Sequence, residues 1–355
     1  MKKKVIALAL SALMLTGLVG CGNNSQSNKS TLKVGMVTDS GTIDDRSFNQ
    51  GTWEGIQKAD KDLGTMSNYM KPTGESDGEY LTEIQNLYDS NYKFIIMSGF
   101  KFEKAAYTAQ NKYNDAKFVI IDAAPVDKDG KESIASNTVA VKFAEEQAGF
   151  MAGIAAAVQL KEGELGFIGG MEAPTVKRFN YGFQQGIEYA KKNYGSNVSL
   201  KKENITYAGS FTDTALGQQL AASMYDNGVK AIFVAAGGTG VGVISEAKTR
   251  AVNGKNVWVI GVDSDQYNDG IYDTKSNKSV ILTSAVKNVS EASYQMIEKE
   301  LNGEFPGGEN IIFNASNNGV GIPEKNPNLS DDTMSKVNEV LELMKNGTIQ
   351  VKTEL

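Results

Sequence analysis

The chain has 355 residues, with 36 Lys and Arg against 42 Asp and Glu, no histidine and a single cysteine. Without imidazole there can be no Ser-His-Asp triad, no Cys-His pair and no His-ligated zinc, and one cysteine cannot form an internal disulfide or a four-cysteine metal site. A chain with a net charge of −6 lacks the excess of basic residues that binding to nucleic acid requires. We therefore expect no cofactor, no metal and no nucleic-acid partner, and the length favours two lobes of roughly 150 residues each.

The first twenty residues have the features of a secretory signal. Lysines at positions 2–4 precede an apolar run over 5–20 that is too short for a membrane span. The run ends in Leu18-Val19-Gly20-Cys21, which is similar to the bacterial lipobox, where cleavage precedes a lipid-bearing cysteine. Cys21 could instead be an ordinary small residue of a signal peptide. Lipidation is favoured because the only cysteine of the chain stands at the cleavage point.

Residues 21–30 are small and polar, as expected of a flexible tether with nothing to bury. Two or three acyl chains on Cys21 would hold the protein stably at a membrane. We therefore expect a monomeric protein on the extracytoplasmic face of the cell membrane, attached only through its lipid anchor. In this prediction, 1–20 is a lipoprotein signal peptide and 21–30 the tether.

From Thr31 onward, short β-branched runs alternate with helical patterns, which is typical of doubly wound parallel sheets with right-handed crossovers. The predicted strands are Lys33–Val37, Lys93–Met97, Phe118–Ile121, Glu164–Ile168, Ile205–Gly209, Ala231–Ala236, Val257–Val262 and Val280–Ser284. The predicted helices are Phe48–Leu63, Tyr80–Tyr88, Lys142–Leu160, Val176–Lys192, Thr214–Asn227, Gly240–Ala251, Val289–Leu301 and Asp331–Lys345. Proline and glycine fall mostly between these elements, and no break in composition marks two domains in series.

Loops that follow the predicted strands carry the candidate binding residues, because ligands of such sheets bind outside the carboxyl ends of the strands. Two aromatic residues stand out, Phe48 after the first strand and Phe211 in the second half. As a pair they could clamp a planar ligand by stacking. Each could also be ordinary packing, and Asp44 or Asp45 could simply cap the helix that begins near Ser47.

Three charged residues, Asp122, Asp263 and Lys287, close apolar runs. They could be exposed loop charges. A carboxylate in such a position can also accept paired hydrogen bonds from vicinal hydroxyls or from a base N–H, and burying it against a polar ligand makes the site discriminating. The sequence leaves both interpretations open.

Two enzyme interpretations fail on spacing. The loop Gly237–Gly242 suggests a dinucleotide site, but Val243 occupies the third glycine position of G-x-G-x-x-G, which leaves a glycine-lined wall. The segment Asp39–Asp45 superficially resembles the calcium-binding aspartate cluster of nucleoside hydrolases. In this chain, however, Val37 stands in place of the first Asp of that cluster, no Pro follows Asp39, and there is no histidine to protonate a leaving base. We expect no enzymatic activity.

Four segments of the chain form a specific pattern: Asp44–Gln50, Phe143–Gly153, Gly166–Met171 and Phe179–Gly186. On these segments the chain resembles the basic membrane protein family of bacterial substrate-binding lipoproteins, from the lipobox to the C-terminus. The resemblance implies an α/β, class I periplasmic-binding-protein fold, in which two doubly wound parallel-sheet lobes are joined by a three-segment hinge. It also implies a receptor that hands nucleosides to an ABC permease and its ATPase.

Residue roles follow from this resemblance by position. It implies that Phe48 and Phe211 stack on a nucleobase, that Asp39 and Asp122 contact the base, and that Asp263 and Lys287 contact the ribose. It further implies backbone contacts in the cleft wall at Gly186 and Gly237, with Asn49 and Asp45 as additional ligand-binding residues. The ligand expected is a nucleoside, purine in the first instance. A receptor for another small polar ligand such as a sugar, or an adhesion lipoprotein, remains an alternative.

We expect the first lobe to comprise 31–141 plus 284–306 and the second lobe 142–283 plus 307–355. The chain would then cross between the lobes three times.

Overall fold

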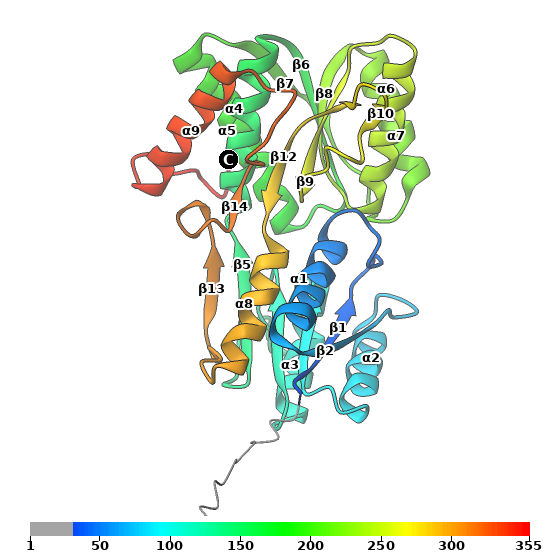
Figure 1. Cartoon of the computed structure of the whole chain (residues 1–355), viewed down its shortest axis with the longest axis vertical. Helices are drawn as coiled ribbons and strands as arrows, with labels where there is room; N and C mark the ends of the chain where they lie inside the picture. Colours follow the sequence, from blue (N-terminus) through cyan, green and yellow to red (C-terminus); the bar gives the residue numbers. More distant parts are fainter. Residues whose placement is uncertain (1–30) are drawn as a thin grey trace, which may run out of the picture. The chain divides into compact units, whose positions relative to one another are not determined.

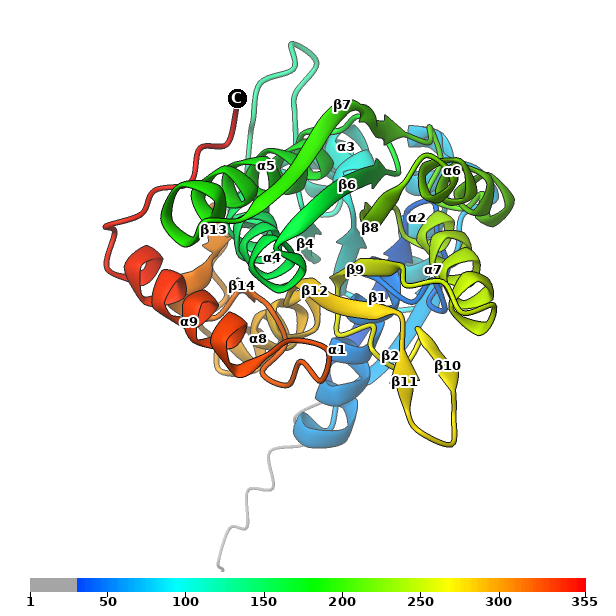
Figure 2. The same ribbon diagram turned by 90° about the horizontal axis from the view of Figure 1, so that it is seen from above.

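Two six-stranded sheets organise the part of the chain that the structure describes, residues 31–355 (Figures 1 and 2). The structure is a computed structural model. The predicted signal peptide, Cys21 and the tether lie outside the described residues. Within residues 31–355, no helix combines the length and the apolar character needed to cross a membrane.

The first sheet is entirely parallel, with the strand order β13-β5-β4-β3-β1-β2. Its inner strands are apolar on both sides because helices cover both faces: Phe94 and Ile96 pack in one cluster, and Ile95 and Met97 in another. Its strands are β1 (Lys33–Thr38), β2 (Met66–Met70), β3 (Phe94–Ser98), β4 (Lys117–Ile121), β5 (Thr138–Phe143) and β13 (Asn310–Phe313). Its helices are α1 (Phe48–Leu63), α2 (Asp77–Asp89), α3 (Glu103–Lys112) and α8 (Val289–Leu301), with the short η1 (Phe100–Phe102) before α3.

The second sheet repeats this plan, with the order β14-β12-β9-β8-β6-β7 and only β14 antiparallel to its neighbour. Its strands are β6 (Glu162–Gly169), β7 (Asn197–Tyr207), β8 (Val229–Ala235), β9 (Trp258–Asp263), β12 (Ile281–Lys287) and β14 (Val320–Gly321). Its helices are α4 (Glu145–Leu160), α5 (Pro174–Tyr194), α6 (Thr214–Asp226), α7 (Gly238–Val252) and α9 (Asp331–Lys345). A small hairpin, β10 (Ile271–Asp273) and β11 (Lys278–Ser279), follows β9, and the one-turn η2 (Ala315–Asn317) precedes β14.

The chain passes between the two sheets three times: from β5 to α4, from β12 to α8, and from β13 to β14 (Figure 1). The crossings lie later than the predicted boundaries at 284 and 306. β12 stays in the second sheet as far as Lys287, because its apolar run continues through buried Ala285. β13 pairs with β5 in the first sheet, so the third crossing follows Phe313. The helix predicted from Lys142 begins at Glu145, since Lys142 still belongs to β5.

Candidate functional site: a pocket between the two sheets

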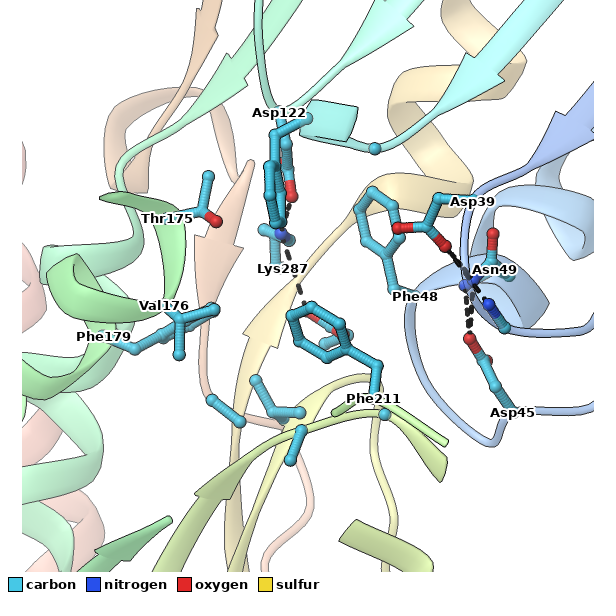
Figure 3. A pocket seen from close by; sticks show the side chains of 18 residues that line it. Asp39, Asp45, Phe48, Asn49, Asp122, Thr175, Val176, Phe179, Phe211 and Lys287 are labelled. Carbon is cyan, nitrogen blue, oxygen red and sulfur yellow. Dashed lines mark hydrogen bonds and ion pairs between the residues drawn. The ribbon is translucent and has the colours of Figure 1, made fainter. Parts of the chain in front are cut away.

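The carboxyl ends of strands from both sheets surround one pocket (Figure 3). Most of the residues predicted from the sequence line it: Asp39, Asp45, Phe48, Asn49, Asp122, Phe211, Gly237, Asp263 and Lys287. The sequence did not identify several other lining residues, among them Phe100, Thr175, Val176 and Phe179.

Gly186 lies elsewhere, which corrects the prediction that it forms part of the cleft wall. It sits within α5, where this helix packs against α4. A Cβ atom at Gly186 would approach the carbonyl oxygen of Phe150 to 2.2 Å. Glycine is therefore needed here because two helix backbones approach closely, and the motif around it serves packing within the second lobe.

Lys287, the last residue of β12, is the cation of the pocket. Its Nζ donates to Asp122 Oδ2 at 2.7 Å and lies 3.8 Å from Asp263 Oδ1. Only 3% of the residue is exposed, and a buried charge is tolerated when it is paired. Burial alone would lower the pKa of Lys287, but Asp122, Asp263 and Glu145 outweigh burial and raise it. Lys287 is thus held as a cation.

Asp122 and Asp263 occupy matching positions in the two sheets, directly after β4 and at the end of β9. Both have a left-handed backbone, with φ of 73° and 64°, a conformation that Asp adopts more readily than most residues. This turn directs both carboxylates toward Lys287. Oδ1 of Asp122 is buried without a hydrogen-bond partner among the described residues. Burial raises the pKa of Asp263 to about 6, against the opposing effects of Lys287 and Ser47.

Glu145 and Arg178 stand behind this cluster, and the sequence interpretation missed them as site residues. The fully buried Glu145 accepts a hydrogen bond from Arg178 Nε at 2.6 Å, and its other oxygen lies 3.9 Å from Lys287 Nζ. Burial raises the pKa of Glu145 to about 7, although Lys287 and Arg178 both act to lower it. An acidic residue that opens a long apolar helix was the available signal, because buried Glu is rare unless paired.

Aromatic rings line the pocket on both sides, and Figure 3 shows Phe48 and Phe211 projecting into it from opposite lobes. Lys287 Nζ lies 4.6 Å from the ring centre of Phe48 and 5.7 Å from that of Phe179, distances suited to cation–π attraction. Phe211 meets Phe100 edge-on at 6.3 Å. Its ring rests against Gly170, where a Cβ atom would come within 2.3 Å of the ring carbons.

Asp45 organises the start of α1. Its carboxylate accepts hydrogen bonds from the backbone N–H groups of Ser47, Asn49 and Gln50, at 2.9–3.1 Å. It therefore satisfies the free amides of a helix N-terminus, the structural role that the sequence left open. Asn49 Nδ2 then bridges Asp45 Oδ2 and Asp39 Oδ1, both at 2.9 Å. Burial raises the pKa of both aspartates.

Hydrogen bonds also close the pocket between the two sheets. Ser47 Oγ donates to Asp263 Oδ2 at 2.5 Å, and Gln266 Nε2 donates to the carbonyl oxygen of Arg46 at 2.8 Å. Arg46 pairs with Asp269 at 3.3 Å. Residues 31–355 contain no group of three or more acidic, Cys or His side chains placed to hold a metal ion. The arrangement suits an uncharged ligand that is rich in hydrogen-bonding groups and has a planar part.

Sequence relatives share nearly the whole chain. A family model described as "ABC transporter substrate-binding protein PnrA-like" matches residues 32–354. The ABC transporter nucleoside-binding protein BmpA of Lactococcus lactis is 37% identical over 339 residues, covering 91% of this chain and 92% of the relative. The CD4+ T-cell-stimulating antigen of Listeria innocua is 35% identical over 369 aligned positions, covering 99% of both chains.

Solved structures support the fold. A solute-binding protein of an ABC transporter system from Aeropyrum pernix superposes with a TM-score of 0.77 at 24% identity, covering 91% of this chain and 93% of that one. The arabinose-binding protein AraP of Geobacillus stearothermophilus superposes with a TM-score of 0.57 at 17% identity, covering 87% and 99%. The predicted class I periplasmic-binding-protein fold is confirmed. With the match over residues 32–354, the chain belongs to the PnrA-like family of ABC transporter substrate-binding proteins.

Proposed function

We propose that the protein is a lipid-anchored receptor that binds nucleosides, purine nucleosides in the first instance, and delivers them to an ABC permease and its ATPase. The observation that carries this proposal is the convergence of Phe48, Phe211 and the Asp122–Lys287–Asp263 cluster on one pocket. The name of the Lactococcus lactis relative, a nucleoside-binding protein, supports the same ligand class. Membership of a substrate-binding family supports the transport role.

The two parts of a nucleoside match the two parts of the pocket. The planar base would lie between Phe48 and Phe211, where stacking on an aromatic side chain is worth about 1–3 kcal/mol per base. The ribose hydroxyls would donate hydrogen bonds to Asp263 and accept them from Lys287. Lys287 donates one short hydrogen bond to Asp122, and its other N–H groups can donate to a ligand. A ligand without these hydroxyls would leave buried polar groups of the protein without hydrogen-bond partners, so the site would discriminate against it.

The receptor would return its ligand chemically unchanged. The family to which the chain belongs binds substrates for transport. Closure around the ligand, through contacts made to both lobes, would present a distinct conformation to the permease, because a ligand shifts a conformational equilibrium only through differential contacts.

Native mass spectrometry of protein purified without added ligand tests the nucleoside assignment directly. We expect an adduct with the mass of a nucleoside, released on denaturation with its glycosidic bond intact. An adduct with the mass of a pentose or hexose would overturn the assignment in favour of a sugar receptor. Appearance of free base on incubation with inosine or adenosine at enzymatic rates would overturn the binding-only role.

Membrane attachment rests on Cys21, which lies outside the described residues. Cys21→Ala should move the protein from the membrane fraction to the medium or leave it as an uncleaved precursor, because the lipid would have no sulfur to join. Cell fractionation and intact-mass measurement check this, with Ser25→Ala in the tether as the matched control. A fully processed Cys21→Ala protein that stays in the membrane fraction would contradict the lipid anchor.

A further inference from the structure

One wall of the pocket offers the ligand hydrogen-bond acceptors and withholds its side-chain donors. This wall, called here the acceptor wall, consists of Asp39, Asp45 and Asn49 from the loop after β1 and the first turn of α1. Asn49 is the only one of the three with N–H groups in its side chain. Its Nδ2 is placed between two carboxylate oxygens, each at 2.9 Å, so both donors are used inside the wall.

The two carboxylates fix the orientation of the Asn49 amide. If the amide were turned over, Oδ1 would lie between the oxygens of Asp39 and Asp45. Three hydrogen-bond acceptors would then face one another with no hydrogen between them. Oδ1 must therefore lie on the other side, where it is buried without a hydrogen-bond partner among the described residues. Asn49 is only 2% exposed, so the amide is also held sterically.

Asp39 is the member of the wall that remains open to a ligand. Both oxygens of Asp45 are occupied by the amides of α1 and by Asn49. Asn49 and the Gly41 amide both donate to Oδ1 of Asp39, at 2.9 and 3.4 Å, and neither donates to Oδ2. In Figure 3 one oxygen of Asp39 faces Asn49, and the other points toward the ring of Phe48, on which a base would stack.

From this geometry we infer that the receptor prefers 6-oxopurine nucleosides, guanosine before inosine, over adenosine, with Asp39 as the specificity-determining residue and Asn49 as the residue that positions it. The inference rests on the proposed nucleoside function. Guanine presents two neighbouring donors, N1–H and the 2-amino group, which match a carboxylate. Hypoxanthine presents N1–H alone. Adenine presents its 6-amino group beside an unprotonated N1, whose lone pair faces an acceptor.

Calorimetric titration of the ligand-stripped protein with guanosine, inosine, adenosine and 1-methylguanosine tests the inference. We expect guanosine to bind at least tenfold more tightly than adenosine, because hydrogen bonds to a charged group are stronger than neutral ones. 1-Methylguanosine, which lacks the N1 proton, should bind at least tenfold more weakly than guanosine. This comparison uses the unaltered protein, so it does not depend on the folding of any variant.

Asp39→Asn provides the reciprocal test. The new amide keeps an oxygen for Asn49 and offers the ligand an N–H, so the preference for guanosine over adenosine should shrink or reverse. Asp263→Asn, at the opposite end of the pocket, is the matched control and should weaken all three nucleosides by the same factor. Equal affinities for guanosine and adenosine, or an equal loss of both in Asp39→Asn, would overturn the inference alone. Failure of every nucleoside to bind would overturn the proposed function and this inference together.

Discussion

Asp122 and Asp263 are the same residue in the same place on two different sheets, yet they are used differently. Asp122 directly follows the buried parallel strand β4 and Asp263 is the last residue of β9; both have a left-handed backbone and face Lys287. Asp122 makes a 2.7 Å bond to Lys287 across the two sheets, whereas Asp263 lies 3.8 Å from Lys287 and makes its short bond to Ser47 of the other lobe.

This difference separates two tasks. Asp122 neutralises the buried lysine. In the proposed nucleoside site, Asp263 is the carboxylate that a ligand would contact while Lys287 keeps its hydrogen bond to Asp122. In both cases the shortest bond joins one lobe to the other, so the proposed ligand site and the contact between the lobes share residues. Variants at the two positions should therefore fail in different ways.

The largest effect is expected from Asp122→Ala. It would leave Lys287 buried with its nearest remaining carboxylate 3.8 Å away. Breaking a buried pair by removing one partner costs about 3–5 kcal/mol, so the free energy of unfolding should fall by that order. Urea denaturation of the unliganded protein measures it, with the exposed Asp129→Ala as control. Equal stability of the two variants would contradict the structural role of Asp122.

Asp263→Ala should affect binding more than stability. Nucleosides should lose at least tenfold in affinity, about 1.4 kcal/mol, whereas free bases should lose much less, because only the nucleoside carries hydroxyls for this carboxylate. Phe211→Ala gives the contrasting pattern, a loss of about ten- to a hundredfold for base and nucleoside alike, since stacking involves only the base. Calorimetry with a nucleoside and its free base measures both variants. An equal penalty in Asp263→Ala for base and nucleoside would refute its role at the ribose.

The pH dependence of binding should follow Asp263. Since burial raises the pKa of Asp263 to about 6, its carboxylate becomes protonated as the pH falls through 6 and loses its capacity as a double acceptor. Nucleoside affinity should decline from pH 7 to pH 5, and this decline should be smaller in Asp263→Asn. Calorimetry across this range is the measurement. A decline of the same size in Asp263→Asn would assign the pH dependence to another group.

Asp263 and Glu145 also make the free energy of unfolding depend on pH, in the direction opposite to nucleoside affinity. Model carboxyl groups titrate near pH 4 in an unfolded chain, whereas burial raises the folded-state pKa of Asp263 to about 6 and of Glu145 to about 7. The folded state thus binds more protons between these values, so the contribution of both groups to the free energy of unfolding is present below pH 4 and is lost as the pH rises through 6 and 7.

Ser47→Ala should have the smallest effect. It removes the hydroxyl that joins α1 to Asp263 but leaves the carboxylate free to bind a ligand. A hydrogen bond of this kind contributes about 0.5–1.5 kcal/mol net, so nucleoside affinity should fall by no more than about tenfold. The affinities for base and nucleoside should fall by the same factor, because the lost hydrogen bond stabilises the closed arrangement of the two lobes and does not contact the ligand. A selective loss for the nucleoside would mean that Ser47 itself contacts the ribose.

Pocket residues that stand at the ends of strands could be predicted from the sequence. Asp122 and Asp263 close apolar runs, and the doubly wound pattern brings such ends together. Helices with a strong apolar stripe were also predictable, and α1, α8 and α9 begin and end at the predicted residues. The short edge strand β2 escaped prediction because its residues MSNYM are partly exposed and none of them is β-branched.

Other features depend on contacts that no local pattern reports. Glu145 contacts the charged cluster behind the pocket only because α4 and α5 place it between Arg178 and Lys287. The motif that contains Gly186 looked like a ligand contact, but its glycine is required by helix packing. The strand β5 was hidden because its residues run directly into the apolar helix α4, which extended the helical pattern to Lys142.

The three crossings have a mechanical consequence. The second crossing consists of the single residue Asn288, which separates β12 from α8, and the first of Ala144 alone, between β5 and α4. Two bodies joined by one flexible strand can swivel freely, but three short adjacent joints remove most relative rotations and leave mainly one bending axis. Lys287 stands beside that axis and shares its sheet with Asp263, so bending would change mainly the distance between Lys287 and Asp122 of the other sheet. We therefore expect the motion of the protein to resemble that of a book rather than that of two beads on a string.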